Sequence, residues 1–298
     1  MSLFDKFIGA TIPLVPKPIV RRIAAPYIAG ETVNEQVATI KDINAQGFMA
    51  ATAILGEFVT QRSESEEAVQ QYEEVLAAIA EQDLDSNIHI KLTHLGLQLD
   101  KEFCCENVQR LLEVAGKYDN FVRIDMEDSP TTDDTFDIFF RLNEKFDNVG
   151  CVVQACLRRT LSDVRRLTET QANVRLCKGI YIEPREIAYL DREEVRTSYV
   201  ALLEELLTGG CYVGIATHDE WLVSEAFRIV DRLGLDAWRY EFQMLHGVGA
   251  ELRRVIIGKG HRLRVAVPFG PMWYAYSVRR LRKNPRIARY VLQAMFRW

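Results

Sequence analysis

Charged side chains lie inside two stretches of the sequence that otherwise read as buried β-strands. Lys91 lies in the stretch NIHIKLTHL and Asp125 lies in FVRIDME. A charge in a buried strand is costly unless it is paired or faces a ligand. The two stretches follow one another along the chain, so a Lys91–Asp125 ion pair is the simplest arrangement. Such a pair would either orient the strands alone or form part of a site.

A second pair of cations, Arg175 and Lys178, lies in the stretch NVRLCKGIYI. Residues three apart on a strand point to opposite faces. Both cations could therefore face one ligand only if the chain turns at KGIY. Gly179 favours such a turn because a glycine lets the backbone approach a ligand closely. The alternative is that Lys178 is a solvated loop residue.

The histidines show no spacing typical of a metal site, and the cysteines show no zinc pattern. His218 follows the stretch GIAT, where a histidine is more often a hydrogen-bonding residue than a metal ligand. No nucleophile elbow supports Ser/His/Asp catalysis. The candidate residues are rich in cations and poor in metal ligands, which favours an anionic cofactor and an anionic substrate.

Near the end of the chain, the stretch WYAYSVRRLRKN places Arg279 and Arg280 side by side. Adjacent residues on a helix point about 100° apart. One guanidinium could therefore grip a carboxylate through two hydrogen bonds while the other reaches a different anion. Tyr276 borders both arginines on one broad face. Spacing alone slightly favours a solvated basic helix over such a clamp.

Eight strand-like stretches alternate with amphipathic helical patterns and would position these side chains. The stretches begin at Phe48, Asn87, Phe121, Val149, Asn173, Tyr212, Tyr240 and Leu263. Most are near-continuous apolar runs, as expected of strands covered on both faces. Between them, Ser63 and Glu66 predict a capping box at a helix start, and Gly234 predicts a helix end.

This alternation predicts one α/β domain, a (β/α)8 barrel of the TIM type over residues 47–298. Residues 1–46 would form an additional N-terminal helical arm. The runner-up is an open doubly wound sheet, but no GxGxxG fingerprint follows any strand. In a TIM-type barrel the active site forms at the C-terminal ends of the strands, where the candidate side chains lie.

The composition is typical of a soluble globular protein, with 48% hydrophobic and 27% charged residues. No apolar run is long enough to cross a bilayer, and the first residues make a poor signal peptide. None of the six cysteines forms a CxxC pair. Buried, reduced thiols in a cytoplasmic protein are therefore expected.

The charge is distributed unevenly along the chain. The segment from Leu252 to Trp298 has twelve Lys or Arg and no acid, which leaves 25 basic and 42 acidic residues elsewhere. A basic segment suggests nucleic acid or an anionic surface, but an anionic small ligand within the fold explains it equally well. A Schiff-base lyase that uses Lys91 or Lys178 is a further alternative.

Eight short motifs, in order, resemble those of the flavin-dependent proline dehydrogenases of the monofunctional bacterial type. They are IKL at Ile90, RIDME at Arg123, VVQA at Val152, VRLCKGIY at Val174, ATHD at Ala216, FQMLHGV at Phe242, VPFG at Val267 and YSVRRL at Tyr276. The resemblance implies a (β/α)8 barrel that binds FAD and oxidises L-proline to 1-pyrroline-5-carboxylate, the first step of proline catabolism. It also implies a quinone electron acceptor and a cytoplasmic location, leaves a peripheral contact at the inner membrane face open, and makes nucleic acid an unexpected partner.

The same resemblance implies roles for individual residues. Lys91, Tyr181, Tyr276, Arg279 and Arg280 would bind the substrate. Asp125 and Arg175 would be catalytic, with Asp125 paired to Lys91 and Arg175 near the flavin N5. The FAD-binding residues would be Met126, Gln154, Arg175, Lys178, Gly179, Ile180, Thr217, His218 and Gln243.

The chain departs from the family pattern at two positions. Ala266 stands where the family usually has a tyrosine in strand eight, and Lys283 stands where it usually has a glutamate one turn past the double arginine. The first change opens space beside the substrate ring, and the second replaces a partner of the arginines with a cation. We therefore hypothesise that the pocket accepts a larger or more polar ring, such as hydroxyproline, or prefers a different cyclic amino acid.

Overall fold

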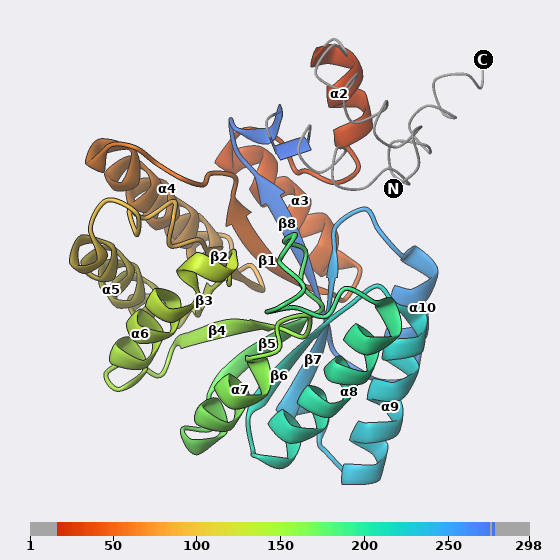
Figure 1. The fold of residues 1–298 in the computed structure, drawn as a ribbon. Helices are drawn as coiled ribbons and strands as arrows, with labels where there is room; N and C mark the ends of the chain where they lie inside the picture. Colours follow the sequence, from red (N-terminus) through yellow and green to blue (C-terminus); the bar gives the residue numbers. More distant parts are fainter. Residues whose placement is uncertain (1–16, 275, 278–298) are drawn as a thin grey trace.

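The computed structural model describes residues 17–274, 276 and 277. Among these residues, eight parallel strands close into a barrel in which each strand pairs with the next and β8 pairs with β1 (Figure 1). The strands are β1 (Met49–Ile54), β2 (Ser86–Ile90), β3 (Val122–Ile124), β4 (Val149–Gln154), β5 (Asn173–Cys177), β6 (Tyr212–Ala216), β7 (Tyr240–Leu245) and β8 (Leu263–Phe269). The predicted strands and the (β/α)8 barrel are confirmed.

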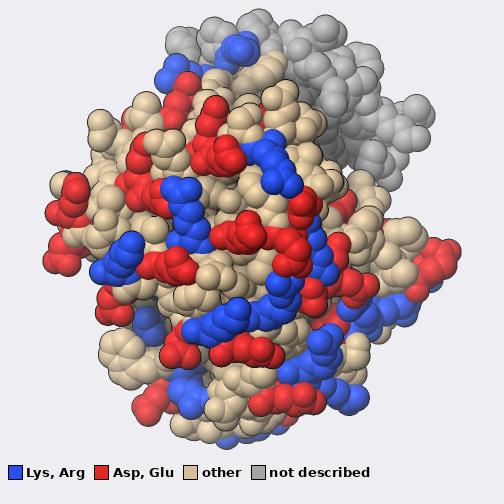
Figure 2. Space-filling model, turned by 90° about the vertical axis from the view of Figure 1, so that its left-hand side faces the viewer, with Lys and Arg blue, Asp and Glu red and all other residues tan. Residues whose placement is uncertain are grey.

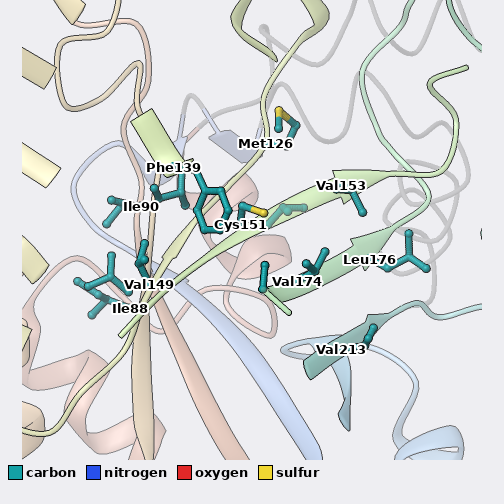
Figure 3. Close-up of a cluster of buried hydrophobic side chains, with 14 of the residues drawn as sticks. Ile88, Ile90, Met126, Phe139, Val149, Cys151, Val153, Val174, Leu176 and Val213 are labelled. Atoms are coloured by element: carbon teal, nitrogen blue, oxygen red, sulfur yellow. The ribbon is translucent and has the colours of Figure 1, made fainter. Parts of the chain in front are cut away.

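Helices surround the barrel and bury its outer face (Figure 1). They are α3 (Val33–Ala45), α4 (Arg62–Glu81), α5 (Lys101–Lys117), α6 (Thr132–Asn143), α7 (Thr160–Glu169), α8 (Arg192–Thr208), α9 (Glu220–Leu233) and α10 (Ala250–Gly258), with short 3-10 turns at Ser129–Thr131 and Ala237–Arg239. Alternate strand residues point outward to them. Figure 3 shows part of this shell, in which Ile88, Cys151 and Leu176 belong to one buried cluster with Phe139 of α6.

The helix α3, which directly precedes β1, packs on the seam between β1 and β8. Ile40 and Ile43 of α3 join one cluster with Ala50 and Val265, which covers the outer face of these strands. The helix α2 (Lys17–Ala24) lies at the end of the barrel where β8 ends (Figure 1). The loop after α2 is tied to β8 by backbone hydrogen bonds, including one of 3.0 Å from the amide of Ala29 to the carbonyl of Pro268.

The inner face of the barrel carries many polar side chains, so the strands are less continuously apolar than the sequence runs suggested. Inward positions alternate with the apolar ones, and they include Asn87, His89, Lys91, Arg123, Asp125, Gln154, Arg175, Glu241, Gln243 and Arg264. Arg123 is buried, yet its Nη1 donates to the carbonyl oxygens of Cys151 (3.1 Å) and Asn173 (2.6 Å). Such buried groups are tolerated because they hydrogen-bond across the barrel.

Of the two predicted helix ends, one is confirmed and one is wrong. Gly234 ends α9 in the left-handed conformation, with φ of 60°, as predicted. The capping box of α4, however, uses Glu64 rather than Glu66, because α4 begins at Arg62. The Glu64 carboxylate accepts from the backbone amides of Thr60 (2.7 Å) and Gln61 (3.0 Å).

The thiols are expected to react slowly in the native protein. All six cysteines are unpaired, and all except the partly exposed Cys177 are buried. Burial raises the thiol pKa of Cys156 and Cys211 to about 11, which suppresses the reactive thiolate at pH 8. A disulfide reagent such as Ellman's should therefore titrate six thiols at once in guanidinium but at most one quickly without it. Rapid reaction of two or more native thiols would contradict this prediction.

The surface over α4, α5 and α6 carries both signs of charge. Figure 2 shows acidic and basic side chains interleaved on this face. Several form ion pairs between neighbouring helices, such as Arg110–Glu73 (2.6 Å) and Arg141–Glu102 (2.7 Å). This face lacks the single-sign field that a nucleic-acid footprint requires. In the described part of the chain, no helix has the length and apolar character needed to span a membrane.

Candidate active site

An ammonium group lies between two carboxylates at the C-terminal ends of β1, β2 and β3. The Nζ of Lys91 is 3.7 Å from Glu57 Oε1 and 3.9 Å from Asp125 Oδ2. Burial disfavours the charge on Lys91, but Asp125, Glu127 and Glu57 outweigh it and raise its pKa above the usual range. Burial likewise opposes ionisation of Asp125, yet Lys91, His89 and Arg175 lower the pKa of its carboxyl. The predicted Lys91–Asp125 pair is therefore present in its charged form.

Glu127 joins the ends of three neighbouring strands beside this pair. Its carboxylate accepts from the amide of Thr93 (3.0 Å) and from the Thr93 hydroxyl (2.6 Å), just past β2. Its carbonyl oxygen accepts from Gln154 Nε2 of β4 at 2.9 Å. This contact fixes the amide of Gln154, whose Oε1 faces the loop at Gly179. Met126, next to Glu127, is buried.

Arg175 lies inside the barrel at β5 and is held from β7. Its Nε donates to Gln243 Oε1 at 2.7 Å, and Gln243 is itself buried. Arg175 also contributes to the lowered pKa of Asp125, which places the two predicted catalytic groups in one electrostatic environment. Tyr181 belongs to the same environment, because Lys91, Glu127 and Glu57 all act on its hydroxyl. Burial is the main cause that raises the pKa of Tyr181.

The chain does turn after β5, and Lys178 is directed to β6. Gly179 has φ of 97°, and a Cβ there would lie 2.2 Å from Cys156 Sγ, so no other residue fits without strain. Lys178 Nζ donates to Asp219 Oδ2 at 3.2 Å. Asp219 also accepts from Arg196 Nη2 at 2.7 Å. Lys178 is therefore anchored rather than a free loop residue, and Ile180 beyond it is exposed.

Thr217 and His218 act as hydrogen-bond partners at the end of β6. The Thr217 hydroxyl accepts from the amide of Asp219 at 3.1 Å. The Nε2 of His218 accepts from the amide of Leu245 at 3.1 Å, which fits a neutral ring protonated on Nδ1. This arrangement agrees with the hydrogen-bonding role expected for His218.

The substrate-binding residues predicted near the C-terminus fall at the edge of the described part of the chain. Tyr276 packs against a cluster of Ala24, Ile28 and Leu55. Leu55 lies two residues before Glu57, which pairs with Lys91. Tyr276 therefore lies at the same end of the barrel as Lys91. Arg279, Arg280 and Lys283 lie outside the described residues.

Three acidic residues organise this end of the barrel: Glu57, Glu127 and Asp219. The sequence showed them as polar residues near strand ends, but sequence reasoning assigned them no role. Each lies three residues past the end of a strand, at β1, β3 and β6. Asp219 follows the predicted His218, and Glu127 follows the predicted Met126. Their partners lie on other strands, loops and, for Asp219, helix α8, so their importance depends on how these elements pack.

Fold and site define a (β/α)8-barrel protein whose polar centre lies at the C-terminal strand ends. Residues 36–292 match the family model described as proline dehydrogenase. The chain is 33% identical over 274 residues to proline dehydrogenase 1 of Bacillus subtilis, covering 92% of this chain and 91% of that protein. It is 31% identical over 280 residues to proline dehydrogenase of Deinococcus radiodurans, covering 92% and 90%. The chain therefore belongs to the proline dehydrogenase family.

Solved structures show the same fold within longer proteins. Proline utilization A from Bdellovibrio bacteriovorus, inactivated by N-propargylglycine, superposes with a TM-score of 0.81 at 24% identity. The match covers 87% of this chain and 32% of that one, so this chain spans about a third of that protein.

Proposed function

We propose that this protein binds FAD at the C-terminal ends of the barrel strands and oxidises L-proline to 1-pyrroline-5-carboxylate, the first step of proline catabolism, with electrons passed to a quinone. The observation that supports it most strongly is the charged Lys91, held by Glu57 and Asp125 beside Arg175, in a chain of the proline dehydrogenase family. This centre combines a site for a carboxylate with a cation suited to an anionic redox group.

The donors around Arg175 fit a flavin nucleotide. Arg175, Gln154 and Lys178 supply donors, and Gly179 lets the backbone approach closely. In this proposal Met126, Ile180, Thr217, His218 and Gln243 complete the cofactor site. The bound flavin supplies the acceptor for the hydride that leaves the substrate ring. Arg175 stabilises the negative charge that builds there, because it is a fixed cation in a partly buried site.

The ammonium of Lys91 suits a substrate carboxylate. Its two ion pairs, at 3.7 and 3.9 Å, are too long for hydrogen bonds, and no described residue accepts a hydrogen bond from its Nζ. Three donors can therefore turn to a carboxylate. In this proposal Arg279 and Arg280 grip the same carboxylate, while Tyr181 and Tyr276 bound the ring. Holding the substrate in one orientation is the main task of these residues.

The protonation of Lys91 disfavours the lyase alternative. A Schiff base requires a neutral amine, but the surrounding carboxylates keep the Lys91 pKa above its usual range. Lys178 is engaged by the buried carboxylate of Asp219. Borohydride in the presence of substrate should therefore trap no adduct on either lysine.

Anaerobic titration with proline tests the proposed function. Protein supplied with FAD should show a flavin absorption band, and proline should bleach it. Lys91→Met should retain the band while requiring far more proline for bleaching, because it removes a substrate contact. Protein that never acquires a flavin band, or a band that proline leaves intact, would refute the proposal.

Restoring a large residue at position 266 is expected to narrow the substrate range. Ala266 is partly exposed in β8 and pairs in register with Ala51 of β1, so this part of the inner wall is built of small residues. Ala266→Tyr should lower kcat/KM for hydroxyproline more than for proline, because the ring would occupy the added space. Ratios of kcat/KM for the two substrates measure this effect. A wild-type protein that strongly prefers unsubstituted proline would contradict the underlying hypothesis.

A further inference from the structure

A hydrogen-bonded chain of side chains runs along the inside of the barrel and ends on Arg175. Glu241 and Gln243 are two residues apart on β7 and share its inner face. Gln243 Nε2 donates to Glu241 Oε1 at 2.6 Å, and Gln243 Oε1 accepts from Arg175 Nε at 2.7 Å. The chain thus links a buried carboxylate on β7 to the guanidinium on β5.

A glycine on β6, the strand between β5 and β7, leaves room for the Gln243 side chain to reach Arg175. Gly214 of β6 pairs in register with Arg175 on one side and with Glu241 on the other. A Cβ at position 214 would lie 2.6 Å from Gln243 Nε2 and 3.6 Å from Arg175 Cα. The Gln243 side chain therefore crosses β6 in the space that a larger residue would fill.

The carboxylate of Glu241 determines which way the Gln243 amide points. A carboxylate can only accept hydrogen bonds, so Gln243 must turn its NH2 group toward Glu241 and its oxygen toward Arg175. Three donors hold Glu241 in place: Gln243, Arg264 Nε (2.8 Å) and the Tyr212 hydroxyl (2.8 Å). Burial opposes the charge, but Arg264 and these hydrogen bonds lower the Glu241 pKa to about 2. The acceptor is therefore ionised at every pH at which the protein would work.

The far end of the chain reaches the opposite end of the barrel. Tyr212, Glu241 and Arg264 line a polar cavity of about 470 Å³ at the N-terminal ends of the strands. Glu241 is therefore remote from the Lys91–Asp125 pair and cannot contact a substrate held there. Any effect that Glu241 exerts on the proposed reaction must pass through Gln243 or act through space.

We propose that Glu241 is a positioning residue of the redox site: through the fixed amide of Gln243 it holds the Arg175 guanidinium against the flavin and so sets the reduction potential of the bound cofactor. This inference rests on the proposed function, because it assumes that Arg175 faces a flavin. A flipped amide would present an NH2 group to Arg175, two donors would face each other, and the guanidinium would move away. The cation would then stabilise the reduced cofactor less.

The test measures the potential of the bound FAD and its affinity in both redox states. Gly214→Ala should displace the Gln243 amide, and Gly258→Ala is the matched control, since a Cβ there meets nothing within 4 Å. Glu241→Gln combined with Arg264→Met removes the carboxylate without leaving a buried charge unpaired. In each test variant, the ratio of the affinity for reduced FAD to that for oxidised FAD should fall about tenfold. This lowers the reduction potential of bound FAD by about 30 mV for a two-electron couple.

A double-mutant cycle separates the chain from a through-space effect. In protein that already carries Gln243→Met, adding Glu241→Gln and Arg264→Met should not shift the reduction potential of bound FAD any further. The hydrogen-bonded link from Glu241 to Arg175 is already broken in that background. Additive shifts, or an unchanged potential in Gly214→Ala, would overturn the inference. If the Glu241 and Arg264 variant does not fold, Gly214→Ala decides. Wild-type protein that binds no flavin would instead defeat the proposed function, which is a separate result.

Discussion

Replacing Arg175 with methionine is expected to lower kcat about 10²- to 10³-fold, the cost of removing one fixed donor from a site of developing negative charge. Methionine keeps the length and apolar stem of the side chain but removes its charge. Arg175 is fixed by Gln243 at 2.7 Å, so the cation is in place before the reaction begins. The loss should therefore fall mainly on kcat, with a smaller change in KM.

Two further measurements distinguish this effect from simple unfolding. The potential of bound FAD should become more negative in Arg175→Met, since the reduced form loses a stabilising cation. Arg228→Met is the matched control, because Arg228 is exposed and pairs with Glu225 on the surface of α9. The control should keep the wild-type potential and kcat. A normal potential together with normal kcat in Arg175→Met would remove Arg175 from the redox site.

The sequence predicted the barrel because the outward-facing side chains of its strands are apolar. Residues such as Ile88, Cys151 and Leu176 pack against helices, and this pattern can be read without knowledge of the fold. The inward-facing side chains were harder to interpret. Glu241 and Gln243 alternate with Tyr240, Phe242 and Met244 in YEFQML, which is a period-two signal for a polar inner face. Their partners lie on β5, β6 and β8, and the sequence alone does not show which residues of these strands align with them.

The candidate site was predictable where its partners lie on neighbouring strands. Lys91 and Asp125 lie directly after β2 and β3, so sequence order alone suggested their pairing. Asp219 shows the limit of this reasoning. Its partners Lys178 and Arg196 precede it by 41 and 23 residues, in a loop and a helix whose placement follows from packing. The motif ATHD shows the acid, but not the cations that it binds.

Replacing Asp219 with asparagine is expected to cost about 1.5–3 kcal/mol of unfolding free energy, the usual contribution of hydrogen bonds to charged groups. The Asp219 side chain is 3% exposed and pairs with Lys178 (3.2 Å) and Arg196 (2.7 Å). Asparagine is nearly isosteric, so the change isolates the charge. The cations left behind would repel each other, and Lys178 would lose its anchor beside the proposed cofactor site. The dissociation constant for FAD should therefore rise at least about tenfold, equivalent to 1.4 kcal/mol.

The effect of Asp219→Asn should depend on pH in one direction. Burial opposes ionisation of Asp219, but hydrogen bonds from Arg196 and Lys178 hold its pKa far below the ordinary 3.8. A carboxyl with a lowered pKa in the folded state contributes its full stability above its unfolded pKa and loses it as the pH falls. The wild type and the variant should therefore differ fully at pH 7, and the difference should shrink progressively below about pH 4, where the unfolded carboxyl takes up its proton. Urea unfolding at several pH values measures this difference, with Glu251→Gln at the exposed Arg254 pair as the control. That control should change stability by less than about 1 kcal/mol. An Asp219→Asn variant as stable as the control at pH 7 would show that this buried carboxylate does not hold the loop after β5 in place.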